Sequence, residues 1–139
     1  MTANLRLQRA LAAPPERVWR ALTDPAALTG WFWPERLDPT AEADLEVGGR
    51  YRIASPTAGM AVAGRYLELA SPHRLACTWS WDGEDTETLV TIELTPSADG
   101  TELTLVHDGF ADDDARDDHV TGWTDCLDRL PGWLASDRG

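Results

Sequence analysis

The residues of this sequence best suited to binding chemistry are its tryptophans, of which there are seven among 139 residues. Most of them fall in three pairs, Trp31/Trp33, Trp79/Trp81 and Trp123/Trp133. A buried aromatic ring covers about 150 to 250 Å², so a wall of such rings can hold an apolar or aromatic molecule with several kcal/mol of favourable contact. The alternative is that the rings fill the core, and this is the interpretation we favour for Trp19.

His107 is the residue with acid–base chemistry that the sequence directs toward the interior. It shares a strand face with Leu103 and Leu105, because alternate residues of a strand point the same way. A buried histidine needs a hydrogen-bond partner. His107 is therefore a polar anchor for a ligand, a proton donor or a structural residue, and a lone inward histidine is most often structural. We assign no catalytic residue, and His107 is the only candidate for one.

A set of predicted ligand-binding residues follows from these positions. Tyr66 is expected to share an inward strand face with Val62, and Phe110 follows the last strand, where it can close the same region. The full set is Trp31, Trp33, Tyr66, Trp79, Trp81, His107, Phe110 and Trp123.

Metal, cofactor and nucleophile chemistry have little support in the sequence. The three histidines are well separated and offer no short-range pair of metal ligands. The acidic run 112–118 lacks the glycine and the spaced ligands of a calcium loop, and it suits a solvated helix start. Cys126 lies among apolar neighbours, so we interpret it, like Cys77, as a buried thiol, and pairing between the two stays open. We predict neither a metal nor a cofactor.

A long C-terminal helix is the element expected to position Trp123. The residues Val120, Trp123, Leu127, Leu130 and Leu134 follow the i, i+3, i+7 spacing of one helical face. Some twenty residues at about 1.5 Å each span roughly 30 Å, which is enough to cross a small domain. Pro131 cannot donate a hydrogen bond to the Leu127 carbonyl, so we expect a kink there.

The other aromatic residues are expected on antiparallel strands. Alternating residue types predict strands at 4–12, 50–54, 60–69, 75–81, 90–94 and 103–107, and a shorter one at Leu45 and Val47 before a Gly48-Gly49 turn. Two short helices are predicted at 14–24 and 26–31, and residues 35–44 are expected to be irregular. A bulge near Tyr66 reconciles the two halves of its strand. We predict that residues 1–139 form one α+β domain, in which a curved antiparallel sheet is combined with the two short helices and the long C-terminal helix.

The net charge of −12 argues against a nucleic-acid partner, because phosphate binding needs a positive footprint. No apolar run approaches the ~20 residues that a membrane span needs, and the N-terminus lacks a secretory signal. We therefore expect a cytoplasmic protein without a nucleic-acid or membrane partner. A homodimer through exposed strand or helix surfaces is an open alternative.

The order of elements resembles the helix-grip fold of START and Bet v 1-like proteins. Five segments narrow the resemblance, namely APPERVWRALTDPAALTGWFWP, GGRYR, GRYLELASPHRLACTWSW, VTIELTP…GTELTLVHDGF and GWTDCLDRL. Together they are similar to the activator of Hsp90 ATPase homologue 1-like family of the START/Bet v 1-like (SRPBCC) superfamily, in its small bacterial single-domain form. The resemblance implies an apolar cavity between the sheet and the final helix.

Three functions are open on these grounds. The first is the binding of an apolar or aromatic small molecule in that cavity, with His107 as one polar group. The second is a small enzyme of cyclase-like or hydrolytic type that uses the same cavity, with His107 as acid or base. The third, which the family name implies, is a chaperone-accessory module that contacts an Hsp90-type protein.

Overall fold

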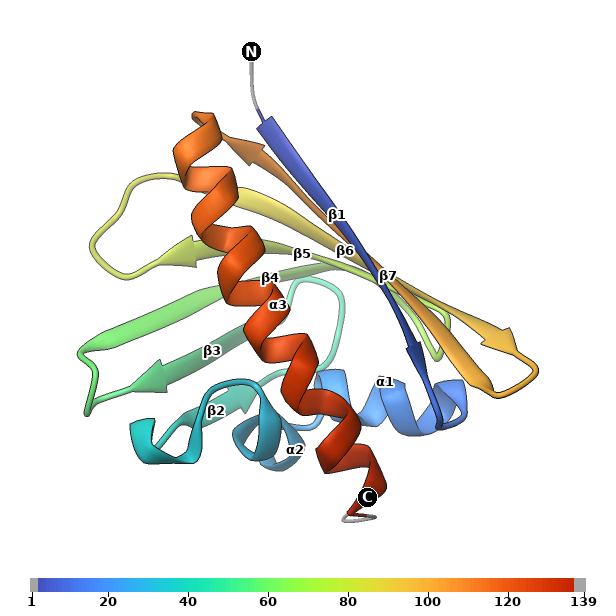
Figure 1. The fold of residues 1–139 in the computed structure, drawn as a ribbon. Coiled ribbons are helices and arrows are strands. Elements are labelled where there is room, and N and C mark those ends of the chain that lie inside the picture. Colours follow the sequence, from blue (N-terminus) through green and yellow to red (C-terminus); the bar gives the residue numbers. More distant parts are fainter. Residues whose placement is uncertain (1–2, 137–139) are drawn as a thin grey trace.

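One antiparallel sheet, with a long helix lying across its concave face, accounts for most of the chain (Figure 1). The structure, a computed structural model, describes residues 3–136. The strands are β1 (Ala3–Leu11), β2 (Thr40–Ala43), β3 (Arg50–Ser55), β4 (Met60–Ala70), β5 (Arg74–Trp81), β6 (Thr88–Ser97) and β7 (Gly100–Phe110). The helices are α1 (Pro15–Thr23), α2 (Pro25–Trp31), the 3₁₀ turn η1 (Glu35–Leu37) and α3 (Asp113–Ala135). The predicted helix-grip fold is confirmed, with a strand order of β1-β7-β6-β5-β4-β3-β2.

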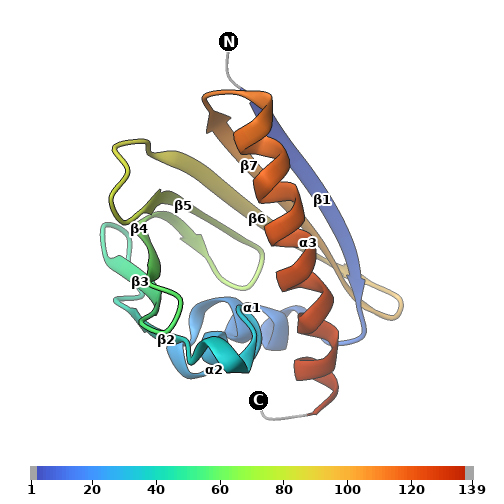
Figure 2. The same ribbon diagram turned by 60° about the vertical axis from the view of Figure 1, so that its left-hand side comes forward.

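The inner face of the sheet forms where apolar residues alternate with polar ones. In the pairing of β6 with β7, the residues Val90, Ile92 and Leu94 lie opposite His107, Leu105 and Leu103. All six are buried. Cross-strand neighbours on one face have Cβ atoms only about 5 Å apart, so these side chains make a continuous layer. His107 is thus the polar end of an apolar row. Helix α3 covers one face of the sheet (Figure 2), and the hydrogen bond from Trp123 to His107 shows that the row lies on that face.

Proline and aspartate residues delimit the two short helices. Pro15 and Pro25 each occupy the first turn of a helix, where a backbone N–H is not needed. Asp24 ends α1 and caps α2, because its carboxylate accepts a hydrogen bond from the Ala26 amide at 3.0 Å. The Trp31 indole N–H donates to the Ala21 carbonyl at 2.9 Å, and this bond ties α2 to α1.

Helix α3 begins at a side-chain cap, since Asp112 accepts a hydrogen bond from the Ala115 amide at 2.8 Å. Its predicted inward face is confirmed, because Trp123, Leu127, Leu130 and Leu134 are buried and Val120 is half-buried. The helix continues through Pro131 to Ala135. Pro131 lies on the exposed side, where water can hydrate the carbonyl that has lost its donor. None of the helices within residues 3–136 is long and apolar enough to cross a membrane.

The prediction for the segment before β3 was wrong. The strand there is β2, at Thr40–Ala43, inside the stretch expected to be irregular, and η1 precedes it. Leu45 and Val47, which were expected to form the strand, are exposed by 48% and 66% in the loop between β2 and β3. The alternation of Leu45 and Val47 was misleading because β2 is a short edge strand, whose half-buried positions hold only alanine.

The predicted bulge in β4 is confirmed. The pairing of β4 with β5 shifts in register between Tyr66 and Glu68. Before the shift, Val62 and Tyr66 are buried on the inner face, whereas Leu67 is exposed at the irregularity. The bulge therefore keeps Tyr66 inside the protein.

Candidate functional site

Five aromatic rings gather where the end of α2, strand β5 and helix α3 meet. We call them the aromatic cluster: Phe32, Trp33, Trp79, Trp81 and Trp123. Trp79 lies at the centre, with its ring centroid 5.0 Å from that of Trp123 and 5.6 Å from that of Trp81. Trp33 stacks on Trp81 with an angle of 13° between the ring planes. Four of the eight predicted ligand-binding residues are therefore brought together from three distant parts of the chain.

A cleft of about 260 Å³, the aromatic cleft, borders this cluster. Its α3 wall consists of Asp118, His119, Gly122, Trp123 and Cys126, which recur at helical spacing. The position of a side chain on Gly122 is open space, so the absence of one widens the cleft. Small-molecule sites usually measure about 300 to 1,000 Å³. The aromatic cleft therefore suits a small ring system better than a lipid.

The interior between the sheet and the helices is nearly filled. A void of about 50 Å³ remains there, bordered by Tyr66 and by inward side chains of β3, β5 and β6. Phe32, Trp79 and Trp123 line both this void and the aromatic cleft, so their rings form the partition between the two spaces. The tryptophans thus occupy much of the room that the family resemblance assigns to an apolar cavity.

His107 is fully buried and makes hydrogen bonds through both ring nitrogens. The Trp123 indole N–H donates to its Nδ1 at 3.0 Å. Since Nδ1 accepts, the proton of the neutral ring is on Nε2, which lies 2.6 Å from Thr88 Oγ1. The Thr88 hydroxyl in turn donates to the Trp79 carbonyl at 3.2 Å. Burial, and then the neighbouring His119, lower the pKa of His107 to about 3. In this arrangement His107 is a neutral link between α3, β6 and β5.

His119 holds Trp81 in a similar way. The Trp81 indole N–H donates to His119 Nε2 at 3.0 Å, and His119 Nδ1 lies 2.8 Å from the Ala115 carbonyl. His119 Nδ1 therefore carries the proton and donates it one helical turn back. This pair connects the end of β5 to α3 at the edge of the aromatic cleft. The sequence offered no reason to prefer His119, because its neighbours in the chain are mostly polar.

Trp79 differs from Trp81 and Trp123 in one respect. Its indole nitrogen is buried and finds no hydrogen-bond acceptor among the residues that the structure describes. A buried donor left without a partner costs about 1 to 3 kcal/mol. The Trp79 ring is only 6% exposed and borders both the void and the cleft. The centre of the cluster thus offers an unused hydrogen-bond donor in apolar surroundings.

The other predicted ligand-binding residues lie away from the aromatic cleft. Trp31 is buried in the core, where its indole N–H is bonded to α1. Tyr66 borders the inner void. Phe110 packs behind the cluster, with its ring centroid 4.4 Å from that of His107 and 4.6 Å from that of His119. These residues support the cluster from the inside.

Phe32 is the most important cleft residue that the sequence analysis missed. It lies between Trp31 and Trp33 in the chain, and its ring contacts those of Trp31, Trp33, Trp79 and Trp123. The run of three aromatic residues was the available signal, but a run that leaves a helix has no fixed periodicity. Its side-chain directions therefore could not be assigned.

Arg129 holds the end of α2 against α3. Its guanidinium donates to the Trp31 carbonyl at 2.9 Å and to the Phe32 carbonyl at 2.8 Å. A third bond, at 2.6 Å, goes to the Asp125 carboxylate. The arginine thus satisfies free carbonyls at a helix C-terminus, where a positive charge is also favoured. It positions the segment that carries Phe32 and Trp33.

Nucleophile and metal chemistry are disfavoured at the cleft. Cys77 and Cys126 are buried free thiols, and burial raises their pKa values to about 11 and about 12. Both therefore stay protonated at neutral pH. Within residues 3–136, no group of three or more histidine, cysteine, aspartate or glutamate side chains is arranged to hold a metal ion.

Residues 12–135 match the model of the family described as activator of Hsp90 ATPase homolog 1-like protein. Protein CV1439 from Chromobacterium violaceum is 35% identical to this chain, and the alignment covers 93% of this chain and 95% of that one with a TM-score of 0.79. The AHSA1 protein SPO3351 from Silicibacter pomeroyi is 28% identical, with 98% and 100% of the two chains covered and a TM-score of 0.78.

A third similar structure is that of DynU16, a protein of the dynemicin biosynthetic locus. It is 27% identical to this chain with a TM-score of 0.82, and the alignment covers 95% of this chain and 47% of DynU16. A search of curated proteins finds no match.

Proposed function

Because this chain belongs to the activator of Hsp90 ATPase homolog 1-like family, we propose that it uses the family's sheet-and-helix frame to bind a small aromatic molecule at the aromatic cleft. The observation that carries the proposal is the buried Trp79 indole N–H, which has no protein acceptor in residues 3–136. The ligand supplies that acceptor, in the form of a carbonyl or ether oxygen. Its ring system lies against the apolar faces of the cluster.

Two energetic terms favour such a ligand. Contact with the tryptophan faces removes apolar surface from water, at roughly 25 cal/mol per Å². A hydrogen bond to Trp79 relieves the penalty of a buried donor without a partner, which is about 1 to 3 kcal/mol. A hydrocarbon of the same shape gains only the first term. The protein should therefore prefer an oxygen-bearing aromatic molecule to its hydrocarbon analogue.

The similarity to DynU16 supports a role in small-molecule chemistry, since that protein comes from a biosynthetic locus. The geometry favours binding over acid–base catalysis. Both nitrogens of His107 are engaged in hydrogen bonds to the protein, and its lowered pKa of about 3 leaves it neutral near pH 7. An enzyme of cyclase-like or hydrolytic type would need another acid or base.

A titration of tryptophan fluorescence with acetylnaphthalene and ethylnaphthalene tests the proposal. The two probes have similar shape, but only the first carries a carbonyl oxygen. We expect saturable quenching by both, with about tenfold tighter binding of acetylnaphthalene, equivalent to 1.4 kcal/mol. The Trp79→Phe variant keeps an aromatic ring and removes the N–H, so it should bind both probes about equally.

Two further variants locate the binding site. Trp33→Ala removes a cleft ring and should weaken binding of both probes. Trp133→Ala is the matched control, because Trp133 is half-buried and borders neither the void nor the cleft. Absence of saturable quenching, or an equal loss of affinity in both variants, would contradict binding at the aromatic cleft. Equal affinities for the two probes in the unmodified protein would contradict the role of Trp79.

The family name supports contact with an Hsp90-type chaperone as a second candidate function. Its test is the ATPase rate of such a chaperone with and without this protein. A rate that does not change with protein concentration rejects this candidate and leaves the ligand proposal untouched.

A further inference from the structure

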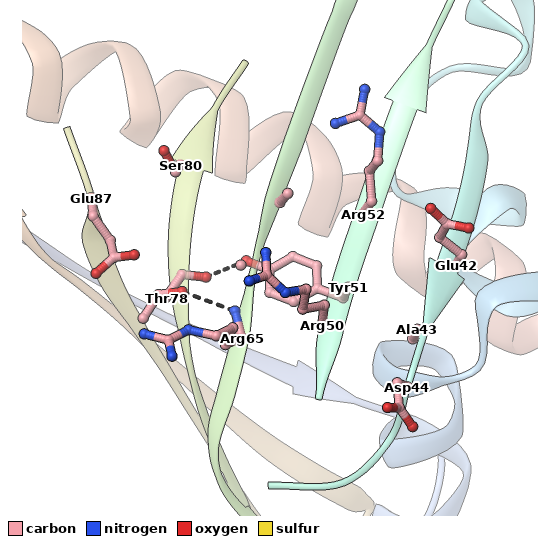
Figure 3. Close-up of a pocket in the computed structure, with 12 residues that line it drawn as sticks. Glu42, Ala43, Asp44, Arg50, Tyr51, Arg52, Arg65, Thr78, Ser80 and Glu87 are labelled. Atoms are coloured by element: carbon pink, nitrogen blue, oxygen red, sulfur yellow. Dashed lines mark hydrogen bonds between the residues drawn. The ribbon is translucent and has the colours of Figure 1, made fainter. Parts of the chain in front are cut away.

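A second hollow, larger than the aromatic cleft, lies on the outer face of the sheet (Figure 3). This outer hollow measures about 610 Å³ and extends from β2 across β3 and β4 to β5. Small residues form its floor, namely Ala63, Gly64, Thr78 and Ser80. The aromatic cleft and the function proposed for it play no part in this site.

Tyr51 holds the floor of the outer hollow in place. Its hydroxyl donates to the Thr78 carbonyl, and the Arg65 amide donates to Thr78 Oγ1 at 2.9 Å. A Cβ atom on Gly64 would meet the Thr78 oxygen at 1.9 Å and the Tyr51 ring at 2.8 Å. Only glycine therefore fits where β4, β5 and Tyr51 converge. The floor is a hydrogen-bonded surface of small residues.

Two arginines without an ion partner in residues 3–136 lie over this floor. Arg50 and Arg65 are directly opposite each other on β3 and β4, and both are exposed on the outer face. Figure 3 shows both side chains lying along the hollow. Among the described residues, no carboxylate comes within 4.0 Å of either guanidinium. Like charges directly opposite across strands destabilise a sheet, so this pair has a cost in the free protein.

Two other arginines of the same sheet, Arg52 and Arg74, are paired with acids. Arg52 makes two hydrogen bonds of 2.8 Å to the Asp82 carboxylate. Arg74 lies 2.9 Å from Glu68 and 3.0 Å from Glu93. Among the described residues Arg6 and Arg9 on β1 have no ion pair either, so what distinguishes Arg50 and Arg65 is that they lie directly opposite each other beside a hollow.

Carboxylates surround the two arginines without reaching them. Glu87 lies at the β6 end of the hollow, and Glu42 and Asp44 lie at the β2 end. They would repel a large polyanion. They would accept hydrogen bonds from hydroxyl groups on a molecule whose anionic group lies between the arginines. The charge pattern is therefore selective for a small anion with a polar body.

We propose that the outer hollow binds a small hydroxylated organic anion, whose carboxylate or phosphate group lies between Arg50 and Arg65. The planar guanidinium groups match the two oxygens of either anionic group, and the bonds are charge-assisted. The small residues of the floor leave room for the body of the molecule, and the rim carboxylates accept its hydroxyl groups.

Nuclear magnetic resonance titration tests this site, with the arginine side-chain N–H and the backbone amide signals as readout. The probes are gluconate, inorganic phosphate and glucose, which is neutral and hydroxylated. We expect gluconate to shift the signals of Arg50, Arg65 and Gly64 saturably and at lower concentration than inorganic phosphate, and glucose not to shift them. Either Arg50→Gln or Arg65→Gln should weaken the binding of the anion about tenfold.

The Arg74→Gln variant is the matched control, because Arg74 lies on the same sheet outside the hollow and is paired with acids. It should bind the anion as the unmodified protein does. The proposal is overturned if gluconate gives no saturable shifts or binds no more tightly than phosphate, if Arg74 responds as strongly as Arg50, or if both glutamine variants keep full affinity. All three substitutions are on exposed or half-exposed residues, so folded protein is available for each measurement.

Discussion

His107 shows how a buried titratable side chain can serve as a connector. Its two nitrogens join Trp123 on α3 to Thr88 on β6, and Thr88 continues the chain to the Trp79 carbonyl on β5. Protonation would place a second proton on Nδ1, which now accepts a bond from an indole that can only donate. The charged ring would therefore lose the Trp123 bond in addition to being buried.

The lowered pKa of His107 predicts a loss of stability in acid. Its pKa falls from 6.5 to about 3 on folding, so the unfolded chain binds the proton more tightly. The stability that neutral His107 contributes to the folded state is fully present above about pH 6.5, and it is lost progressively as the pH falls toward about 3. We expect the free energy of unfolding, measured with urea, to decline between about pH 7 and about pH 5.

Variants separate this effect from general acid denaturation. His107→Gln should be less stable near neutral pH and should show a shallower decline. His73→Gln removes an exposed histidine and should keep the steep decline of the unmodified protein. The same slope in His107→Gln and in the unmodified protein would refute the assignment.

Among the elements, α3 and α2 are held together by contacts that amphipathic spacing does not reveal. Arg129 is on the half-exposed flank of α3, yet it donates to two carbonyls at the end of α2. Gly30 lies against the Trp133 ring, so α2 and α3 approach closely there. Of these two contacts, the Arg129 bonds are the ones that position Phe32 and Trp33.

Arg129→Met should loosen the junction while keeping the apolar stem of the side chain. Bonds to a charged group contribute about 1.5 to 3 kcal/mol each, and partial exposure of Arg129 reduces this, so we expect a loss of about 2 kcal/mol in stability. Hydrogen exchange of the Phe32 amide, which donates to the Leu28 carbonyl at 3.0 Å, should become faster.

Arg20→Met is the control for Arg129→Met. Arg20 forms an exposed pair with Asp24 at 3.5 Å on α1, and its loss should cost less than about 1 kcal/mol. If the two variants lose equal stability, or if Phe32 exchange is unchanged in Arg129→Met, the junction does not depend on Arg129.

Gly30→Ala tests the close approach of the two helices. The new Cβ would lie 2.5 Å from Trp133 Nε1, so we expect a loss of about 1 to 3 kcal/mol from overpacking. In a Trp133→Ala background the clash is absent, and the same change should stabilise the protein by up to about 1 kcal/mol, because alanine favours a helix over glycine. The test is a thermal unfolding measurement on four proteins: the unmodified protein, the two single variants and the double variant. An equal effect of Gly30→Ala in both backgrounds would mean that the ring does not restrict this position.

At the scale of the whole molecule, the aromatic cleft and the outer hollow lie on opposite faces of one sheet. The aromatic cleft opens on the side covered by α3 and has mainly apolar walls. The outer hollow has charged walls and a floor of small residues. Tyr51 connects the two sides, because it borders the inner void and its hydroxyl reaches the Thr78 carbonyl beneath the outer hollow. The two hollows therefore differ in chemical character, with apolar walls on one face and charged walls on the other.

The order of elements was predictable because it depends on local patterns. Alternation predicted β5, β6 and β7, and helical spacing predicted the buried face of α3, since each pattern reflects which side chains one element turns inward. Edge strand β2 was misplaced because none of its residues is fully buried and the pattern is correspondingly weak. The family resemblance could also be recognised from the sequence, because the motifs that carry it lie on helices and strands.

The site could be predicted only in part. Residue type and strand phase suggested Trp79, Trp81 and Trp123, because large inward rings on facing elements must meet. Only the tertiary structure showed that the Trp123 indole N–H donates to His107 Nδ1, because the bend from β7 into α3 brings these two residues together. Three other features also depend on how separate strands pack and align, which periodicity along one segment does not encode. They are the filled interior, the Trp79 N–H without an acceptor, and the position of Arg50 opposite Arg65.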